Sequence, residues 1–462
     1  MKKLWLVVVL AGLTGLSSKA FADVQNIRIS GDIRIRGYFI DSAGETGGAQ
    51  DTSNASFISQ RTRVSVEADL EDHVLVVVTL QAEGEWGDDN QPSASSGGSD
   101  AGAGSAGSSG AIARRWSLGV AEAYVQFNEI FYTPATLKLG RQYLQYGHGL
   151  ILSSVEQEYN YDAARLVLDY YPLTIDLVGA EVVNNQTFSA TPTHDGANDL
   201  LFVNARYELS DSAIKDVEAY FGWLSQSDNH LLTDSRVPPS AGGSSPIIIG
   251  LRTDINPLDA LQTWGEAAYE FGESGDPAAT SISAMIANVG ARYTLKNVQW
   301  VPAFNANYIF ASGGGKDGTA SQFRPWFDYA DGYNGYLFEP SLQNIHILNL
   351  GASVKPYENT TLSLQGYYYL KAEKGSTAGS NANVDYGGPV WAAPGLDNTA
   401  DSRELGWELD GIVGYDYSKD VRAQLVYAVF IPEGAYENAA SNGGFGVSRT
   451  AQEVRAELNV KF

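Results

Sequence analysis

Four arginines near the start of the chain have the spacing of an anion-binding ladder. Arg34 and Arg36 are two residues apart, and so are Arg61 and Arg63. In an extended strand, residues two apart point to the same side, so each pair presents two guanidinium groups from one face. A guanidinium stays charged at every biological pH and can bind a carboxylate through two parallel hydrogen bonds. The pattern therefore favours binding of an anion such as a chain of uronic acids.

Acids share this face with the arginines, and this leaves a second interpretation open. Asp32, Glu67 and Asp69 have the same parity as the four arginines. Opposite charges on neighbouring strands commonly form cross-strand pairs. In that case the four arginines brace the barrel wall by pairing with Glu67 and Asp69. The sequence alone does not decide between a selectivity site and a set of braces.

Other chemistry finds little support in the sequence. Histidine and serine come close in the chain where His148 precedes Ser153 and Ser154, but neither GxSxG nor HExxH occurs. A histidine in a glycine-rich loop is typically solvated, so we expect His148 to be solvated and the protein not to be an enzyme. No catalytic residue, metal site or cofactor is predicted, because there is no cysteine and no CxxCH motif for haem. Scattered acids leave calcium binding in the loops open.

The elements that carry these side chains are predicted to be strands with one apolar and one polar face. Ile33 and Ile35 oppose Arg34 and Arg36, and the final residues VRAELNVKF alternate in the same way up to Phe462. About eighteen such segments fit between residues 23 and 462, each of the length that a transmembrane strand needs. A soluble sandwich would show the same alternation, so further evidence is required.

The start of the chain indicates export from the cytoplasm. Residues 1–22 contain two lysines, an apolar run from Leu4 to Leu16, and then Ala20-Phe21-Ala22, which together are typical of a cleaved signal peptide. No later run of about 18 apolar residues could form a membrane helix. A closed barrel is the other structure that can span a bilayer. We therefore predict an all-β fold, in which residues 23–462 form a single transmembrane antiparallel β-barrel.

The connections between the predicted strands alternate in length. Residues 41–56, 88–113, 147–160 and 312–342 are long and polar, whereas 71–73, 171–172 and 418–419 are short. This alternation is typical of long extracellular loops and short periplasmic turns. The low-complexity stretch QPSASSGGSDAGAGSAGSSGA at 91–111 is predicted to be a flexible outer loop.

Aromatic residues are typical of a membrane interface. The chain has 26 tyrosines and 9 tryptophans at a net charge of -24. Many lie near predicted strand ends, where barrels carry aromatic belts: Trp86, Tyr143, Tyr146, Tyr367 to Tyr369, Tyr415 and Tyr417. We expect Phe462 to face lipid at the periplasmic edge.

Several stretches resemble the alginate-export porins of Gram-negative outer membranes. They are LKLGRQYLQYGHGLIL (137–152), FRPWFDYADGYNGY (323–336), NLGASVKPYENTTLSLQGYYY (349–369) and RELGWELDGIVGYDYSKDVRAQLVYAVFIPEGA (403–435). The resemblance implies a monomeric barrel of about eighteen strands whose arginine-lined lumen passes an anionic uronic-acid polymer, with loops gating the channel.

From the alternation and the resemblance together we predict an outer-membrane channel for a polysaccharide, an oligosaccharide or another small polar or anionic solute. The predicted pore-lining residues are Arg34, Arg36, Arg61, Arg63, Arg165, Arg206, Arg292 and Arg422. Predicted partners are an anionic or neutral saccharide, outer-membrane lipid and lipopolysaccharide, and the assembly machinery that recognises a terminal phenylalanine such as Phe462. No nucleic acid partner is predicted. A non-specific diffusion porin, a sheath around a partner protein and, remotely, an outer-membrane hydrolase remain as alternatives.

Overall fold

The computed structural model describes the strands and part of the connections between them. The described residues are 24–41, 54–70, 73–86, 117–154, 160–184, 197–209, 212–226, 243–276, 279–316, 319–323, 325–326, 334–338, 340, 342–374, 402–437 and 450–462. The predicted signal peptide at 1–22 and the low-complexity stretch at 91–111 lie outside these residues.

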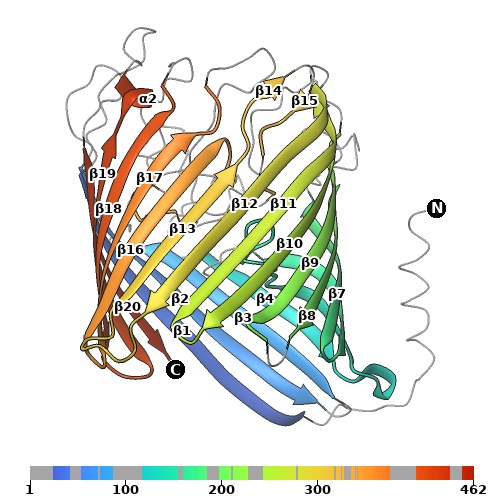
Figure 1. Cartoon of the computed structure of the whole chain (residues 1–462). Coiled ribbons are helices and arrows are strands. Elements are labelled where there is room, and N and C mark those ends of the chain that lie inside the picture. The colour runs from blue at the N-terminus through green and yellow to red at the C-terminus, as the bar shows by residue number, and fades with distance from the viewer. Residues whose placement is uncertain are drawn as a thin grey trace, which may run out of the picture.

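Eighteen long antiparallel strands form a closed barrel, which confirms the predicted fold class and strand number (Figure 1). The strands are β1 (Val24–Asp41), β2 (Asn54–Leu70), β3 (Val74–Glu85), β4 (Ser117–Phe127), β5 (Ala135–Gln142), β6 (Tyr161–Tyr170), β7 (Leu173–Asn184), β8 (Ala197–Glu208), β9 (Ile214–Gln226), β10 (Ser245–Leu258), β11 (Leu261–Asp276), β12 (Ala279–Thr294), β13 (Ala303–Ala311), β16 (Ile345–Tyr357), β17 (Thr360–Lys371), β18 (Glu404–Asp416), β19 (Val421–Pro432) and β20 (Ala451–Lys461). Each pairs with the next in this order, and β20 pairs with β1 to close the ring.

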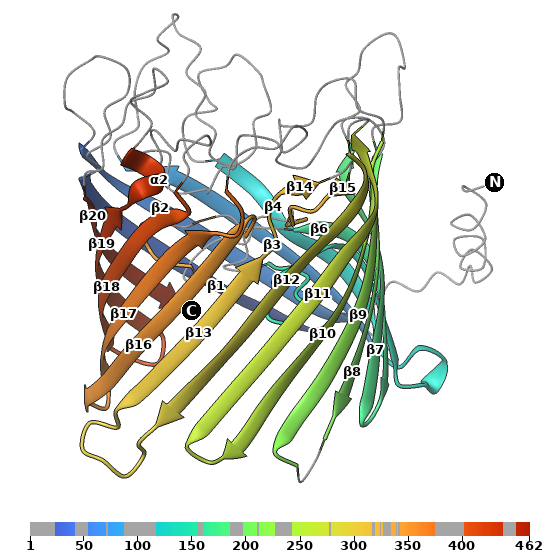
Figure 2. The ribbon, with the colours of Figure 1, turned by 45° about the horizontal axis from the view of Figure 1, so that its top comes forward.

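Short elements lie on the connections. The two-residue strands β14 (Gly315–Lys316) and β15 (Thr319–Ala320) form a small hairpin beside β12, and α2 (Gly434–Glu437) follows β19. Both lie at the rim that carries the long connections (Figure 2). A 3-10 turn, η1 (Ile130–Tyr132), connects β4 to β5 at the other rim. Among the described residues, no helix is both long and apolar enough to cross a bilayer.

Alternating residues face the outside and the inside of the barrel, as the sequence pattern predicts. On β1, Ile27 and Ile29 are 60% and 68% exposed on the outer surface, whereas Arg34 and Arg36 are 6% and 7% exposed within the lumen. This arrangement follows from the period of two in a strand and from the need for an apolar outer band against lipid tails. Because the ring is closed, neighbouring strands satisfy the backbone hydrogen bonds that lipid cannot.

The two rims differ in the length of their connections. Tight turns such as 171–172, 259–260 and 358–359 lie on the rim where β1 begins and β20 ends, and most connections on the opposite rim are long (Figure 1). The alternation is not strict, since β11 and β12 are joined on the long-connection rim by residues 277–278 alone. On the short-turn rim, the connection 295–302 is longer than the adjacent turns 259–260 and 358–359.

The end of the chain closes the barrel against a glycine. The backbone amides of Gly31 and Phe462 each donate to the other residue's carbonyl, at 2.9 and 3.0 Å. The Phe462 ring lies over Gly31 on the outer surface, where a Cβ atom on residue 31 would come within 2.6 Å of Phe462 Cζ and overlap the backbone oxygen of Arg63. Phe462 is 60% exposed.

Because this space is filled, Gly31→Ala should destabilise the barrel. Overpacking typically costs about 1–3 kcal/mol, and the backbone oxygen of Arg63 cannot move without disturbing the strand pairing. Gly179→Ala on β7 is the matched control, since nothing lies within 4 Å of its added methyl group. We expect a lower urea midpoint for Gly31→Ala alone, measured by the heat-modifiable mobility of the folded barrel on a gel. Equal midpoints for the two variants would contradict this packing.

Candidate functional site

A first segment of chain, residues 143–154, folds into the lumen directly after β5. We call it the first inward segment. Leu144, Leu150 and Leu152 are buried, and the Tyr146 ring stacks on Phe202 of β8 with centroids 4.9 Å apart. The prediction that Tyr146 belongs to an outer aromatic belt is therefore wrong, because its ring packs against a lumenal side chain. The segment narrows the channel from within.

Acids on the far wall hold the tip of this segment. The backbone amide of Gly147 donates to Glu218 on β9 at 2.9 Å, and that of His148 donates to Glu266 on β11 at 2.6 Å. Tyr146 donates its hydroxyl to Asp176 on β7 at 2.9 Å. Gly147 has a φ of 59°, and a Cβ there would overlap the Glu266 carboxylate, so both the backbone angle and the close approach require glycine.

The side chain of His148 is part of the same network, so the expectation of a solvated histidine is wrong. Its Nε2 lies 3.0 Å from Asp254 and its Nδ1 lies 3.3 Å from Glu266. The loop turns inward, which brings the imidazole against acids that are more than a hundred residues later in the chain. Burial acts to lower the pKa of His148, but the hydrogen bonds to Glu266 and Asp254 outweigh burial and the nearby Arg252, so the pKa is raised.

The raised pKa gives the constriction an expected pH dependence. Since the folded pKa lies above the usual value of about 6.5, the ionic anchor is complete below that pH and is lost as pH rises through the raised pKa. Single-channel current should therefore become noisier as pH rises, because the first inward segment is held less firmly.

His148→Gln should remove this pH dependence, because glutamine carries no titratable charge. The control is His73→Gln, which changes an exposed histidine in a turn on the opposite rim. The measurement is current noise in planar bilayers at pH values below and above the transition. An identical pH profile for wild type and His148→Gln would rule out this anchor.

A second inward segment, residues 334–338, lies against the opposite side of the lumen. The Glu408 carboxylate on β18 accepts three backbone N–H groups from it: those of Tyr336 and Leu337 at 2.7 and 2.8 Å, and that of Phe338 at 2.8 Å. The Phe338 ring stacks on Phe430 of β19 with centroids 4.4 Å apart. Tyr369 of β17, also assigned to the aromatic belt by sequence, instead faces inward and donates to Asn334. Like the first inward segment, this one is anchored by hydrogen bonds to acids or tyrosines of the barrel wall.

The four arginines of the first two strands come together on the lumenal wall. We call Arg34, Arg36, Arg61 and Arg63 the arginine cluster. Arg34 lies directly opposite Arg61 in the β1–β2 register, and all four are at most 9% exposed. Asp32 lies 2.5 Å from Arg63 and 3.7 Å from Arg61. Glu457 of β20 lies 2.5 Å from Arg36.

The acids expected to brace the cluster have another partner. Arg28 lies 2.9 Å from Glu67 and 3.5 Å from Asp69. The interpretation in which Glu67 and Asp69 pair with the arginine cluster is therefore wrong. Its physical cause is the strand register, which places Arg28 opposite Glu67 and Asp32 opposite Arg63.

The other four predicted pore-lining arginines are not brought to the cluster. Arg165 and Arg206 lie 2.5 Å from Asp176 and Asp216, respectively, and Arg422 lies 3.5 Å from Asp416. Arg292 is exposed near the short-turn rim and makes no ion pair with any residue in the described part of the chain. These arginines lie on β6, β8, β12 and β19, so they face the lumen at separate places.

Acids dominate the wall that faces the arginine cluster. In the closed ring, β10 is nine strands from β1 in either direction. The inward acids on this wall are Asp176, Asp216, Glu218, Asp254, Glu266 and Glu270, and the arginines that contact them are Arg165, Arg206 and Arg252. The lumen thus has an acid-rich wall, which holds the first inward segment, opposite the wall that carries the arginine cluster. Within the described residues, no group of His, Asp and Glu side chains is arranged to hold a metal ion.

Sequence reasoning missed the inward segments, although a signal was present. GLIL at 149–152 and YLF at 336–338 are apolar runs within long connections. Loops exposed to water seldom carry such runs, because nothing there would bury them. Both runs lie in or beside the stretches 137–152 and 323–336 that carry the family resemblance.

A closed barrel of eighteen strands with a charged lumen and inward-folded segments is an outer-membrane barrel of the porin class. Residues 26–444 match the model that describes the alginate export family. The chain belongs to that family, as the resemblance in its sequence indicates.

Solved porin structures have the same fold at low sequence identity. OccAB1 of Acinetobacter baumannii has a TM-score of 0.54 at 13% identity, covering 96% of this chain and 98% of that chain. OccK2 of Pseudomonas aeruginosa, solved in complex with glucuronate, has a TM-score of 0.54 at 9% identity, covering 95% and 97%. OccK11 of the same organism has a TM-score of 0.53 at 13% identity, covering 96% and 97%. No curated protein matches the sequence significantly.

Proposed function

We propose that this protein is an outer-membrane channel for anionic saccharides, with carboxylated sugars such as uronates as the substrate class. The observation that carries the proposal is the arginine cluster, where four guanidinium groups from two adjacent strands face one region of the lumen. Support comes from the alginate export family and from OccK2, a barrel of similar fold that was solved with glucuronate.

The geometry suits a binding site that an anion can leave again. Asp32 and Glu457 already contact the cluster, so a passing carboxylate competes with protein acids for each guanidinium. Conduction requires binding that is favourable at several sites and tight at none. The acid-rich wall opposite repels the same carboxylate, and the field between the walls orients it in a low-dielectric channel.

The same geometry argues against hydrolysis. Ser154 Oγ donates to the carbonyl of Leu144 at 2.8 Å and accepts from its amide at 2.9 Å, so this hydroxyl is used to shape the first inward segment. His148 contacts Asp254 and Glu266. We therefore include a non-enzymatic role in the proposal. A sheath around a partner protein is also disfavoured, because the two inward segments occupy the lumen.

Current block by saccharides tests the substrate class. Purified barrel in planar bilayers should show current interruptions with oligouronates, and far fewer with neutral oligosaccharides of equal length at equal concentration. The interruptions should weaken as salt rises, because screening reduces the attraction of the cluster for carboxylates. Equal block by charged and neutral sugars would support a non-specific diffusion porin instead.

A further inference from the structure

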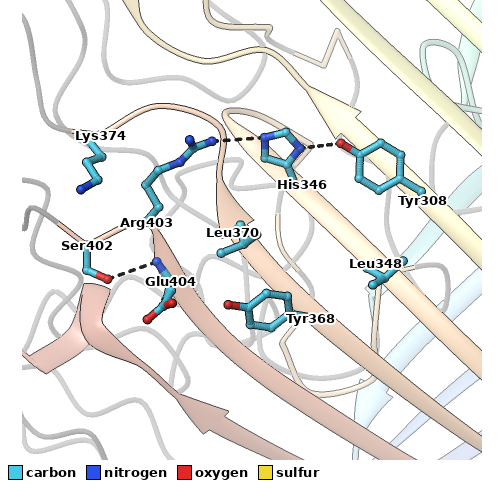
Figure 3. A pocket seen from close by; sticks show the side chains of 9 residues that line it. All are labelled: Tyr308, His346, Leu348, Tyr368, Leu370, Lys374, Ser402, Arg403 and Glu404. Atoms are coloured by element: carbon cyan, nitrogen blue, oxygen red, sulfur yellow. Dashed lines mark hydrogen bonds between the residues drawn. The ribbon is translucent and has the colours of Figure 1, made fainter.

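A pocket of about 710 Å³ opens on the outer wall of the barrel, away from the lumen. Its lining comes from the long-connection ends of four strands: Tyr308, His346, Leu348, Tyr368, Leu370, Lys374, Ser402, Arg403 and Glu404 (Figure 3). The alternation on β16 places it outside, since Ile345 and Ile347 are buried toward the lumen while Leu348 is 42% exposed. The pocket thus lies on the outer face of the barrel, close to the long-connection rim.

Two cations, Arg403 and Lys374, lie at the polar end of the pocket. The Arg403 guanidinium donates from Nε to the carbonyl of Lys371 at 2.8 Å and from Nη2 to the carbonyl of Ala372. Within the described residues its Nη1 has no protein acceptor, and neither does the ammonium group of Lys374. Fixing a guanidinium through backbone carbonyls prepares it for an external anion, because little side-chain freedom is left to lose.

A hydrogen-bond chain leads from Arg403 across His346 to Tyr308. Arg403 Nη2 lies 3.4 Å from His346 Nε2, and His346 Nδ1 lies 2.7 Å from the Tyr308 hydroxyl (Figure 3). Because Arg403 can only donate, Nε2 accepts and the proton resides on Nδ1. His346 then donates to the Tyr308 oxygen, which leaves the Tyr308 O–H group free to donate to a ligand.

The other end of the pocket is apolar. Leu348, Leu370 and the ring of Tyr368 form it, and Tyr368 stacks on Trp407 with centroids 4.0 Å apart. This end continues into the outer band that faces lipid tails. A site with fixed cations at one end and apolar side chains at the other matches an amphiphile with an anionic head and an acyl chain. Glu404 contributes one acid against the two cations.

We propose that this pocket binds a phosphorylated glycolipid of the outer leaflet, with its phosphorylated head at Arg403 and Lys374 and an acyl chain along Leu348 and Leu370. The inference rests on the orientation in the proposed function, in which the long-connection rim faces the cell exterior. Phosphate is favoured because it has more acceptor oxygens than a carboxylate and can therefore accept from both cations.

Native mass spectrometry of the detergent-solubilised full chain can test the site with the diphosphorylated lipid anchor of lipopolysaccharide as the probe. The double variant Arg403→Gln/Lys374→Gln should bind at least about tenfold more weakly, since each lost charge-assisted contact contributes about that much. The matched control is Arg422→Gln/Lys419→Gln, which removes one arginine and one lysine from the opposite rim and should bind like wild type.

Three further arms identify the ligand source. Inorganic phosphate should not displace the glycolipid from the wild-type protein. A dephosphorylated glycolipid should bind the wild-type protein as weakly as the intact glycolipid binds the double variant. An ordinary phospholipid should compete poorly with the glycolipid. Displacement by phosphate alone, equal binding by phospholipid, or equal binding to wild type and the double variant would each overturn the proposal. Oligouronate block should be unchanged in the double variant, because these residues lie outside the lumen. Failure of this site is therefore distinguishable from failure of the proposed channel function.

Discussion

Replacing Glu408 with alanine should release the second inward segment and give a wider, noisier channel. Its carboxylate is the shared acceptor for three backbone N–H groups at 2.7 to 2.8 Å. Hydrogen bonds to a charged group contribute about 1.5–3 kcal/mol each, less where lumenal water can replace the acceptor. Losing all three should leave the segment attached by stacking on Phe430, by the Tyr369 bond to Asn334 and by the Arg455 bond to the carbonyl of Tyr336. Single-channel conductance and open-channel noise should both rise.

Glu404→Ala is the control for this change. Glu404 is on the same strand but exposed on the outer surface, so its removal should leave conductance unchanged. The conductance and noise of Glu408→Gln should lie between those of Glu408→Ala and Glu404→Ala, since an amide keeps one acceptor oxygen. A Glu408→Ala channel with the conductance and noise of wild type would show that the other contacts hold the segment without Glu408.

The second large effect is expected from the arginine cluster. Changing Arg34, Arg36, Arg61 and Arg63 to glutamine should lower the preference for anions over cations by about tenfold, the low end of what focused charge does to local ion concentration. Oligouronate block should disappear in the same variant. Arg292→Gln, which removes an exposed lumenal arginine far from the cluster, should change neither property.

Stability must be separated from selectivity in this experiment. The cluster is buried against Asp32 and Glu457, and breaking a buried ion pair typically costs about 3–5 kcal/mol. Adding Asp32→Asn and Glu457→Gln to the fourfold variant removes the carboxylates that would otherwise be left without their arginine partners. Glu83→Gln is added as well, because Glu83 lies opposite Arg61 on β3. The compensated variant should regain much of its stability and still lack anion preference. If instead it selects anions like wild type, the arginines only brace the wall.

The barrel itself is predictable from sequence because its signal is local. The period of two along a strand places Ile27 and Ile29 outside and Arg34 and Arg36 inside whatever the rest of the chain does. The resemblance of four stretches to alginate-export porins identifies the same fold and the same family. Both inferences use information that is contained within single strands or hairpins.

The partners of the charged residues are not predictable in this way. Whether Glu67 lies opposite Arg28 or opposite a cluster residue such as Arg34 depends on the β1–β2 register, which alternation leaves open in steps of two residues. The contact of His148 with Glu266 joins residues 118 positions apart and depends on a loop entering a closed ring. Side-chain alternation carries no information about loops, so the constriction follows only from the complete barrel.

The reversal potential of a single wild-type channel in a potassium chloride gradient tests the central claim most directly. The chain has a net charge of -24, and its lumen has an acid-rich wall, so cation selectivity would be the simple expectation from composition. If the arginine cluster controls the narrow part of the lumen, the potential should have the sign of chloride selectivity and should approach zero in the fourfold arginine variant. A wild-type potential at zero, or with the sign of potassium selectivity, would contradict a channel built for anionic saccharides.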